Sequence, residues 1–270
     1  MKRVGVMIEK IGIQIYSVRN YTGNSYQIRD TFRKLKAMGY DCLQTAGKPS
    51  VSYEEYGKIA SEEGLAICGT HDDFKMMQND IAQSIENHRF LNTRIMGIGG
   101  NSYEGSDKTW RTMGYHTEDQ LFGTIEAINK IADNIYPEGF KFSYHHHGFE
   151  FRKYKGKTVL QHIIDETDRK KVSICLDTYW VQYGGADIRQ TIKELTGRID
   201  IIHLKDMGRD EKEPFQTYIG DGNMYWEGII KEAIDAGVKY FLVEQEYFQD
   251  RDPFECLKRS SEYLHNNFMK

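Results

Sequence analysis

The feature that most constrains the fold is a unit that recurs along the whole chain. Each unit consists of a short β-branched or aromatic run, a polar loop, an amphipathic helical pattern such as that at 125–135, and a glycine close to the next run. Eight alternations of this kind predict a parallel sheet covered by helices. The runs predicted as strands are 11–18, 40–45, 65–71, 93–98, 140–147, 172–178, 198–204 and 239–246.

Closure of this sheet into a barrel is favoured over an open doubly wound sheet. An open sheet usually carries a glycine-rich phosphate loop after its first strand, and residues 15–25 contain no GxGxxG. The length of 270 residues suits an α/β barrel of about 250 residues, and no linker divides the chain. We therefore predict a single (β/α)₈ TIM barrel domain over 1–270. The long irregular stretches 99–116 and 205–224 each follow a strand, so we expect βα loops on the catalytic face.

Local signals place several element boundaries. Ser52-x-x-Glu55 and Thr117-x-x-Gln120 are capping boxes that predict helix starts. Glycine precedes five of the strands, and at such positions it can adopt the left-handed conformation that ends a helix. These glycines are Gly39, Gly64, Gly139, Gly197 and Gly237.

Composition excludes several classes of function. The net charge of −4 provides no basic footprint for nucleic acid. The mean hydropathy is −0.64, and no apolar run approaches the roughly 20 residues that span a bilayer. The first ten residues lack the apolar stretch of a secretory signal, so we expect a cytoplasmic protein. None of the four cysteines is spaced as CxxC, which indicates reduced, buried thiols rather than metal or redox roles.

Ionisable side chains gather at the carboxyl ends of the predicted strands, which meet at one mouth of a barrel. Among them, Asp177, His203 and Glu244 offer two carboxylates and an imidazole, a set suited to Mn²⁺, Mg²⁺ or a catalytic Zn²⁺ with an open position. The full group comprises His71, His145, His147, Asp177, His203 and Glu244. The sequence therefore predicts a metal site at the mouth.

Five motifs in order resemble the xylose-isomerase-like barrel superfamily, and the resemblance runs nearly end to end. That superfamily includes sugar isomerases and epimerases, inosose dehydratases and endonuclease-IV-like nucleases. The resemblance implies one metal held by Glu, Asp, His and Glu at four strand ends, and Asp177, His203 and Glu244 match the last three. The motifs are YHHHGFEF (144–151), LDTYWVQYGG (176–185), HLKD (203–206), IGDG (219–222) and VEQE (243–246).

The first ligand departs from the family pattern. Where many relatives have Glu-Asn-His at the end of the fifth strand, this chain has His145-His146-His147. Either His145 binds the metal, or Glu150 reaches it from the following loop. Glu150 would keep the anionic charge that a hard cation prefers, and it would free His145 to act as a base. We predict Glu150 as the ligand and Mn²⁺ as the ion, with Mg²⁺ or Zn²⁺ as alternatives.

The same departure bears on the reaction. Family epimerases use two metal-bound glutamates, whereas a histidine beside a polarised carbonyl suits abstraction of the α-proton by a single base. The YHHH strand resembles inosose dehydratases and the catalytic subunits of bacterial C-glycoside deglycosidases. We therefore predict a carbon–oxygen or carbon–carbon lyase acting on a keto-sugar or 3-oxo-glycoside, with His145 as base and Lys205 stabilising developing charge. Isomerisation or epimerisation is the alternative. His71, His147 and Trp180 are predicted to bind substrate.

The sequence supports two other functional classes less well. A nuclease of the endonuclease IV type would need three metals and a basic rim, which the acidic balance opposes. A non-catalytic sugar-binding subunit would need a damaged metal set, and three ligands are matched. The expected partner is a small sugar or glycoside, with no nucleic acid and no membrane. A small second subunit or a homo-oligomer is compatible with the deglycosidase resemblance.

Overall fold

The structure is a computed structural model that describes residues 7–100, 115 and 117–269. Its centre is an eight-stranded parallel sheet with the strand order β3-β2-β1-β12-β9-β8-β5-β4. Each strand lies close to one of the eight runs predicted from sequence. The strands are β1 (Ile11–Gln14), β2 (Cys42–Ala46), β3 (Ala66–His71), β4 (Ile95–Ile98), β5 (Lys141–His145), β8 (Val172–Asp177), β9 (Ile201–Leu204) and β12 (Tyr240–Val243).

The sheet curls until its two end strands, β3 and β4, meet. The amide of Asp72 donates to the carbonyl of Gly97 at 2.8 Å, and the amide of Gly97 donates to the Thr70 hydroxyl at 3.2 Å. These bonds join the edges into a nearly closed barrel, so the predicted single (β/α)₈ barrel is confirmed.

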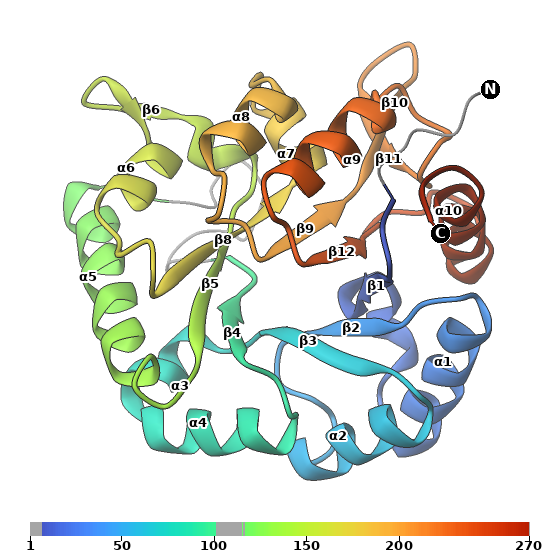
Figure 1. The fold of residues 1–270 in the computed structure, drawn as a ribbon, viewed down its shortest axis with the longest axis horizontal. Coiled ribbons are helices and arrows are strands. Elements are labelled where there is room, and N and C mark those ends of the chain that lie inside the picture. Colours follow the sequence, from blue (N-terminus) through green and yellow to red (C-terminus); the bar gives the residue numbers. More distant parts are fainter. Residues whose placement is uncertain (1–6, 101–114, 116, 270) are drawn as a thin grey trace.

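Helices form an outer ring around the barrel (Figure 1). Their inward faces are apolar; in the helix Ser25–Ala37, for example, Ile28, Phe32 and Leu35 are fully buried. The helices are η1 (Ile15–Tyr21), α1 (Ser25–Ala37), α2 (Tyr53–Glu62), α3 (Phe74–Asn79), α4 (Ile81–Phe90), α5 (Glu118–Ile135), η2 (Gly148–Phe151), α6 (Val159–Asp165), α7 (Thr178–Tyr183), α8 (Ile188–Glu194), α9 (Trp226–Asp235) and α10 (Pro253–Phe268).

The predicted boundary signals are present. Ser52 caps α2 by accepting from the Glu55 amide, and Thr117 and Gln120 form the complete capping box of α5. All five glycines that precede strands have φ between 74° and 94°. Among the helices of the described segments, none combines the length and apolar character needed to cross a membrane.

Two expectations about elements need correction. The run 11–18 is a strand only to Gln14, because the Gln14 side chain accepts the Tyr16 amide and starts a 3₁₀ helix. The stretch 205–224 is not wholly irregular, since it contains an antiparallel hairpin of β10 (Asp206–Arg209) and β11 (Pro214–Thr217). A second short hairpin pairs β6 (Lys153–Tyr154) with β7 (Lys157–Thr158).

Most of the other predicted catalytic-face loop, 99–116, lies outside the described residues.

Candidate metal centre

Three neighbouring strands bring the best-matched candidate ligands together. Asp177 ends β8 and pairs in register with His203 of β9, while Glu244 directly follows β12 on the other side of β9. One ligand atom from each of these residues, and one from His145, lie within 4.8 Å of one another. All four side chains are buried. The expected convergence at one mouth is therefore present in the structure.

Further side-chain contacts hold Asp177, His203 and Glu244 in place. The Oδ1 atom of Asp177 caps α7 by accepting the Trp180 amide at 3.1 Å, which leaves Oδ2 facing the cluster. Nδ1 of His203 lies 2.9 Å from Oε2 of Glu244 and 3.9 Å from Oδ2 of Asp177. The side chains are thus positioned before any ligand arrives.

Lys205 is fully buried at the centre of the acidic groups. Its Nζ lies 3.1 Å from Oδ2 of Asp177, 2.9 Å from Oε2 of Glu244 and 2.6 Å from Oε1 of Glu246. Burial opposes the charge of Lys205, but the three carboxylates outweigh it and hold its pKa well above the usual range. Lys205 is therefore a cation at neutral pH, able to donate to an oxygen but not to accept a proton.

A buried cage is formed by Asp177, His203, Lys205, Glu244 and Glu246. Its charges leave an excess of negative charge. Burial raises the pKa of Asp177 to about 6, so its carboxyl is still ionised at neutral pH. Burial also disfavours ionisation of Glu244, but Lys205 and His203 outweigh this effect and hold its pKa well below the usual range. Burial opposes the charge of His203, but its contacts with Cys175 and Glu244 outweigh this effect and hold its pKa well above the usual range. Three carboxylates, one ammonium and one imidazolium therefore leave a net charge of −1. Carboxylate oxygens, an imidazole nitrogen and this charge together fit a divalent cation.

His145 and Glu150 are placed differently from the sequence interpretation. His145 is inside the group that could hold an ion, and Glu150 is not. Both oxygens of Glu150 are already engaged, because the Tyr144 hydroxyl donates to Oε1 at 2.8 Å and the His147 amide donates to Oε2 at 2.9 Å. Burial raises the pKa of Glu150 to about 8, which keeps it mostly protonated at neutral pH. This geometry does not favour Glu150 as a metal ligand.

His145 has one nitrogen available to the cage. Its Nδ1 lies 3.4 Å from the carbonyl oxygen of Cys175, which can only accept, so Nδ1 carries the hydrogen and Nε2 has a free lone pair. Burial, reinforced by the neighbouring histidines, holds the pKa of His145 well below its usual range. The imidazole is therefore neutral at pH 7 and can accept a proton or bind a cation.

The three predicted substrate-binding residues line the same region. The rings of His71 and His147 lie 4.9 and 4.7 Å from that of His145. The ring centroids of Trp180 and His147 are 5.5 Å apart, and Nζ of Lys205 lies 5.4 Å from the ring centroid of Trp180. All three are buried around the cage, which is compatible with their predicted role but does not test it.

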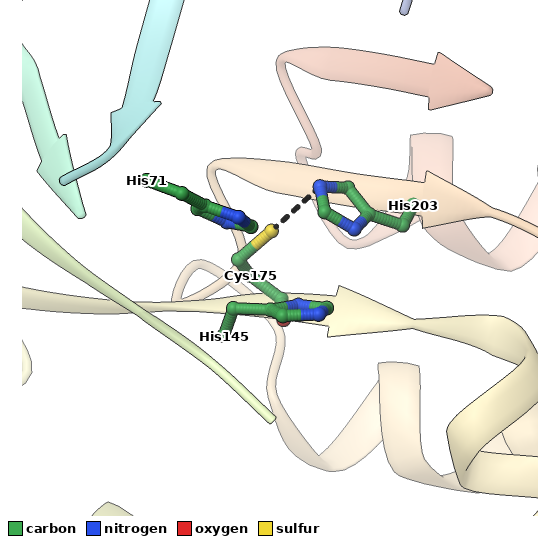
Figure 2. A group of neighbouring side chains, drawn as sticks. All are labelled: His71, His145, Cys175 and His203. Atoms are coloured by element: carbon green, nitrogen blue, oxygen red, sulfur yellow. Dashed lines mark hydrogen bonds between the residues drawn. The ribbon is translucent and has the colours of Figure 1, made fainter. Parts of the chain in front are cut away.

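The sequence interpretation missed several buried polar residues next to the cage. Glu246 shares the inward face of Glu244 by strand alternation, and Gln14 and Gln44 are polar residues at the ends of apolar strands, the signal that selected the histidines. A second group that could hold an ion consists of His71, His145, Cys175 and His203. Figure 2 shows its sulfur directed at His203, with the other two rings on either side.

The HLKD and IGDG motifs meet in the segment that follows β9. Oδ2 of Asp206 accepts from the amides of Gly220 and Gly222 at 2.8 and 3.2 Å and from the Trp226 indole at 2.8 Å. A Cβ at Gly222 would lie 2.3 Å from Oδ1 of Asp206, so this close approach needs glycine. The two motifs together anchor the loop that follows His203 and Lys205.

Comparison with known proteins gives curated and structural relatives. An inosose dehydratase from Geobacillus thermodenitrificans is 28% identical over 194 residues, which cover 63% of this chain and 63% of that protein. The match thus spans less than two thirds of the relative's length. A sugar phosphate isomerase/epimerase from Parabacteroides distasonis superposes with a TM-score of 0.81 at 22% identity, over 97% of this chain and 96% of the other.

A third relative has been solved with an ion. A xylose isomerase-like TIM barrel protein from Mycobacterium smegmatis, in complex with magnesium, superposes with a TM-score of 0.69 at 14% identity, over 96% of each chain. These identities are low enough that the structural matches establish the fold alone. The profile of the family described as xylose isomerase-like TIM barrel matches residues 32–266. Since this match covers most of the barrel, the chain belongs to the xylose isomerase-like TIM barrel family.

Proposed function

We propose that this protein is a divalent-metal-dependent lyase that removes a proton α to the carbonyl of a keto-sugar and then eliminates a β-substituent. The observation that carries the proposal is the buried cage in which Asp177, His203 and Glu244 converge beside His145 and Lys205. The substrate class comes from relatives: curated matches include inosose dehydratases, and the fold matches include sugar isomerases and epimerases.

Three protein ligands would hold the ion, namely Asp177, His203 and Glu244. Three ligands leave coordination positions open, as catalytic metal sites require. A bound ion would supply Lewis-acid polarisation of the substrate carbonyl. We propose Mn²⁺ first, with Mg²⁺ or Zn²⁺ as alternatives, because the cage combines two carboxylates with one imidazole.

The chain's own residues would carry out the proton chemistry. His145, neutral and with Nε2 free of the contact that its Nδ1 makes, takes the proton from the carbon next to the carbonyl. The ammonium of Lys205 donates to the oxygen on which negative charge develops. The electron pair of the broken C–H bond then forms a double bond and expels the group at the β carbon, a hydroxide that leaves as water in a dehydration.

Substrate would be held around this centre by the neutral rings. Nδ1 of His71 lies 3.1 Å from the side-chain amide nitrogen of Gln14. Nε2 of His71 has no hydrogen-bond partner among the described residues. A buried ring nitrogen with no partner suits a sugar hydroxyl. Trp180 offers an apolar ring face beside His147.

Metal dependence can be tested by elemental analysis and by incubation with EDTA. We expect about one divalent ion per chain and loss of turnover when the ion is removed. Full turnover of the metal-free protein would refute the proposal.

The role of His145 is tested by His145→Ala, with His265→Ala on α10 as a remote control. We expect the first variant to lose deuterium exchange from D₂O into an inosose or 3-oxo-glycoside while keeping its ion. Loss of the ion instead would make His145 a ligand.

Elimination and isomerisation are distinguished by product mass. A dehydration product is lighter than the substrate by one water, whereas an isomer or epimer has the same mass. Exchange without a mass change would support the epimerase alternative, which the sugar isomerase/epimerase fold matches also favour.

A further inference from the structure

Two donor sets overlap at the floor of the mouth. The oxygen-rich set contains Asp177 and Glu244, and the other contains His71 and Cys175; both share His145 and His203. The first suits hard ions such as Mg²⁺ and Mn²⁺, whereas three imidazoles and a sulfur suit thiophilic ions. His203 is placed so that either of its nitrogens could bind: Nδ1 faces Glu244 at 2.9 Å, and Nε2 lies 3.3 Å from Sγ of Cys175.

A chain of hydrogen bonds decides which nitrogen of His203 is available. The backbone amide of Tyr16 can only donate, and it bonds Oε1 of Gln14 at 3.0 Å. The other terminal atom of Gln14 is therefore its NH₂ group, which donates to Oε1 of Gln44 at 2.8 Å. Because Gln44 presents its oxygen here, Nε2 of His203, at 2.7 Å from the same atom, must carry a hydrogen and donate.

The remaining contacts agree with this assignment. Nε2 of Gln44 points to the carbonyl of Thr70, an obligatory acceptor, at 3.5 Å. The NH₂ group of Gln14 also lies 3.1 Å from Nδ1 of His71, which must then accept. His71 accordingly carries its hydrogen on Nε2, the nitrogen that has no partner in the described part of the chain. All four side chains are buried, so water does not compete with these bonds.

We propose that the Gln14–Gln44 pair determines metal specificity: it holds a hydrogen on Nε2 of His203, turns Nδ1 toward the carboxylates, and so disables the thiophilic set. With Nε2 protonated, His203 cannot bind an ion together with Cys175. The buried thiol is thereby kept out of coordination although it lies beside the site. This inference rests on the metal dependence proposed above, and it makes Gln14 and Gln44 positioning residues.

The test uses Co²⁺ as a probe, because a cobalt–thiolate bond gives a strong near-ultraviolet charge-transfer absorption that oxygen and nitrogen ligands lack. Wild type should bind Co²⁺ without this band. Gln44→Leu, which removes the acceptor, should gain the band and bind Mn²⁺ about 10–100-fold more weakly, the usual effect of losing a group that orients a ligand. Gln44→Glu keeps an acceptor at the same place and should resemble wild type.

The double variant Gln44→Leu/Cys175→Ser provides the control for the sulfur and should lose the band. If Gln44→Leu does not fold, the hydrogen positions can still be tested by a measurement on the wild-type protein. In the Mg²⁺-loaded protein, nitrogen-15 shifts should show a hydrogen on Nε2 of His203 and on Nε2 of His71, and no hydrogen on either Nδ1 atom.

Two results would overturn the inference: a thiolate band in wild type, or a hydrogen on Nδ1 of His71. A protein that binds neither Mn²⁺ nor Co²⁺ would refute the proposed metal dependence itself, which is a different failure. Wild-type binding without the band, followed by its appearance in Gln44→Leu, supports both.

Discussion

Replacing Lys205 with methionine should destabilise the metal-free protein strongly and make it more responsive to metal. The side chain has no exposed surface, and its Nζ touches one oxygen each of Asp177, Glu244 and Glu246. Methionine fills a similar volume but removes the cation, so the cage changes from a net charge of −1 to −2. Removing one partner of a buried ion pair typically costs about 3–5 kcal/mol, because the other charge stays buried without compensation.

That cost translates into a measurable shift. At about 2–4 °C per kcal/mol for a chain of this size, the midpoint of thermal unfolding in EDTA should fall by about 6–20 °C. Divalent ions should restore much of the loss, since a ligand at 100 times its Kd adds about 2.7 kcal/mol. The proposed ion would compete with Lys205 for the carboxylates of Asp177 and Glu244. We therefore expect Mn²⁺ to raise the midpoint more in Lys205→Met than in wild type.

The assay is thermal unfolding followed by circular dichroism, in EDTA and in excess Mn²⁺. Lys239→Met is the matched control, because Lys239 is 64% exposed and its partner Asp200 keeps a second contact with Lys141 at 2.7 Å. Such a surface pair should cost less than about 1 kcal/mol. If Lys205→Met unfolds at the wild-type temperature in EDTA, or if Mn²⁺ stabilises it less than wild type, the charge balance argued here is wrong.

Two further substitutions test the surroundings of the cage. The pKa of Glu150 is raised from 4.5 to about 8 by burial, so its protonated form stabilises the fold below about pH 4.5, and this contribution is lost as the pH rises toward 8. Urea unfolding of Glu150→Gln should therefore show a stability that improves relative to wild type by up to about 1.4 kcal/mol per pH unit in that window; a constant difference would contradict the raised pKa. Gly222→Ala places a Cβ 2.5 Å from the carbonyl oxygen of Met207 and should cost about 1–3 kcal/mol, whereas Gly123→Ala, in open space on α5, should be neutral or stabilising. Equal stability of these two alanine variants would show that the IGDG turn can relax.

Periodicity was sufficient to predict the barrel but not every element within it. The eight apolar runs and the glycines before them identify strands because both follow from local backbone preferences. The 3₁₀ helix that cuts the first run short starts at Gln14, whose side chain accepts the Tyr16 amide. Asp206, the first residue of the β10–β11 hairpin, accepts from the amides of Gly220 and Gly222, which lie 14 and 16 residues further along the chain. Side-chain hydrogen bonds leave no periodic signal, whether they are local as at Gln14 or join more distant residues as at Asp206.

The candidate metal centre could likewise be predicted from topology, but not from the hydrogen bonds of individual side chains. Strand alternation and barrel topology placed Asp177, His203 and Glu244 together correctly, since carboxyl ends of parallel strands share one mouth. The preference for Glu150 rested on charge alone, and charge does not say which oxygens are already occupied. Tyr144 and the His147 amide occupy both of them, a fact that depends on the η2 turn.

The contacts of Lys205, Gln14 and Gln44 explain how one mouth can hold so many ionisable groups without losing its geometry. Buried charges are tolerated when each is paired, and here Lys205 pairs with the carboxylates while the glutamines fix the imidazoles. The carboxylates outnumber the cations by one, and this excess of negative charge is compatible with a bound metal ion. Binding of the proposed cation would be coupled to the stability of the fold through the same oxygens of Asp177 and Glu244. Apolar side chains could supply rigidity alone, whereas His145, Asp177, His203 and Glu244 also have the spacing to hold a metal ion.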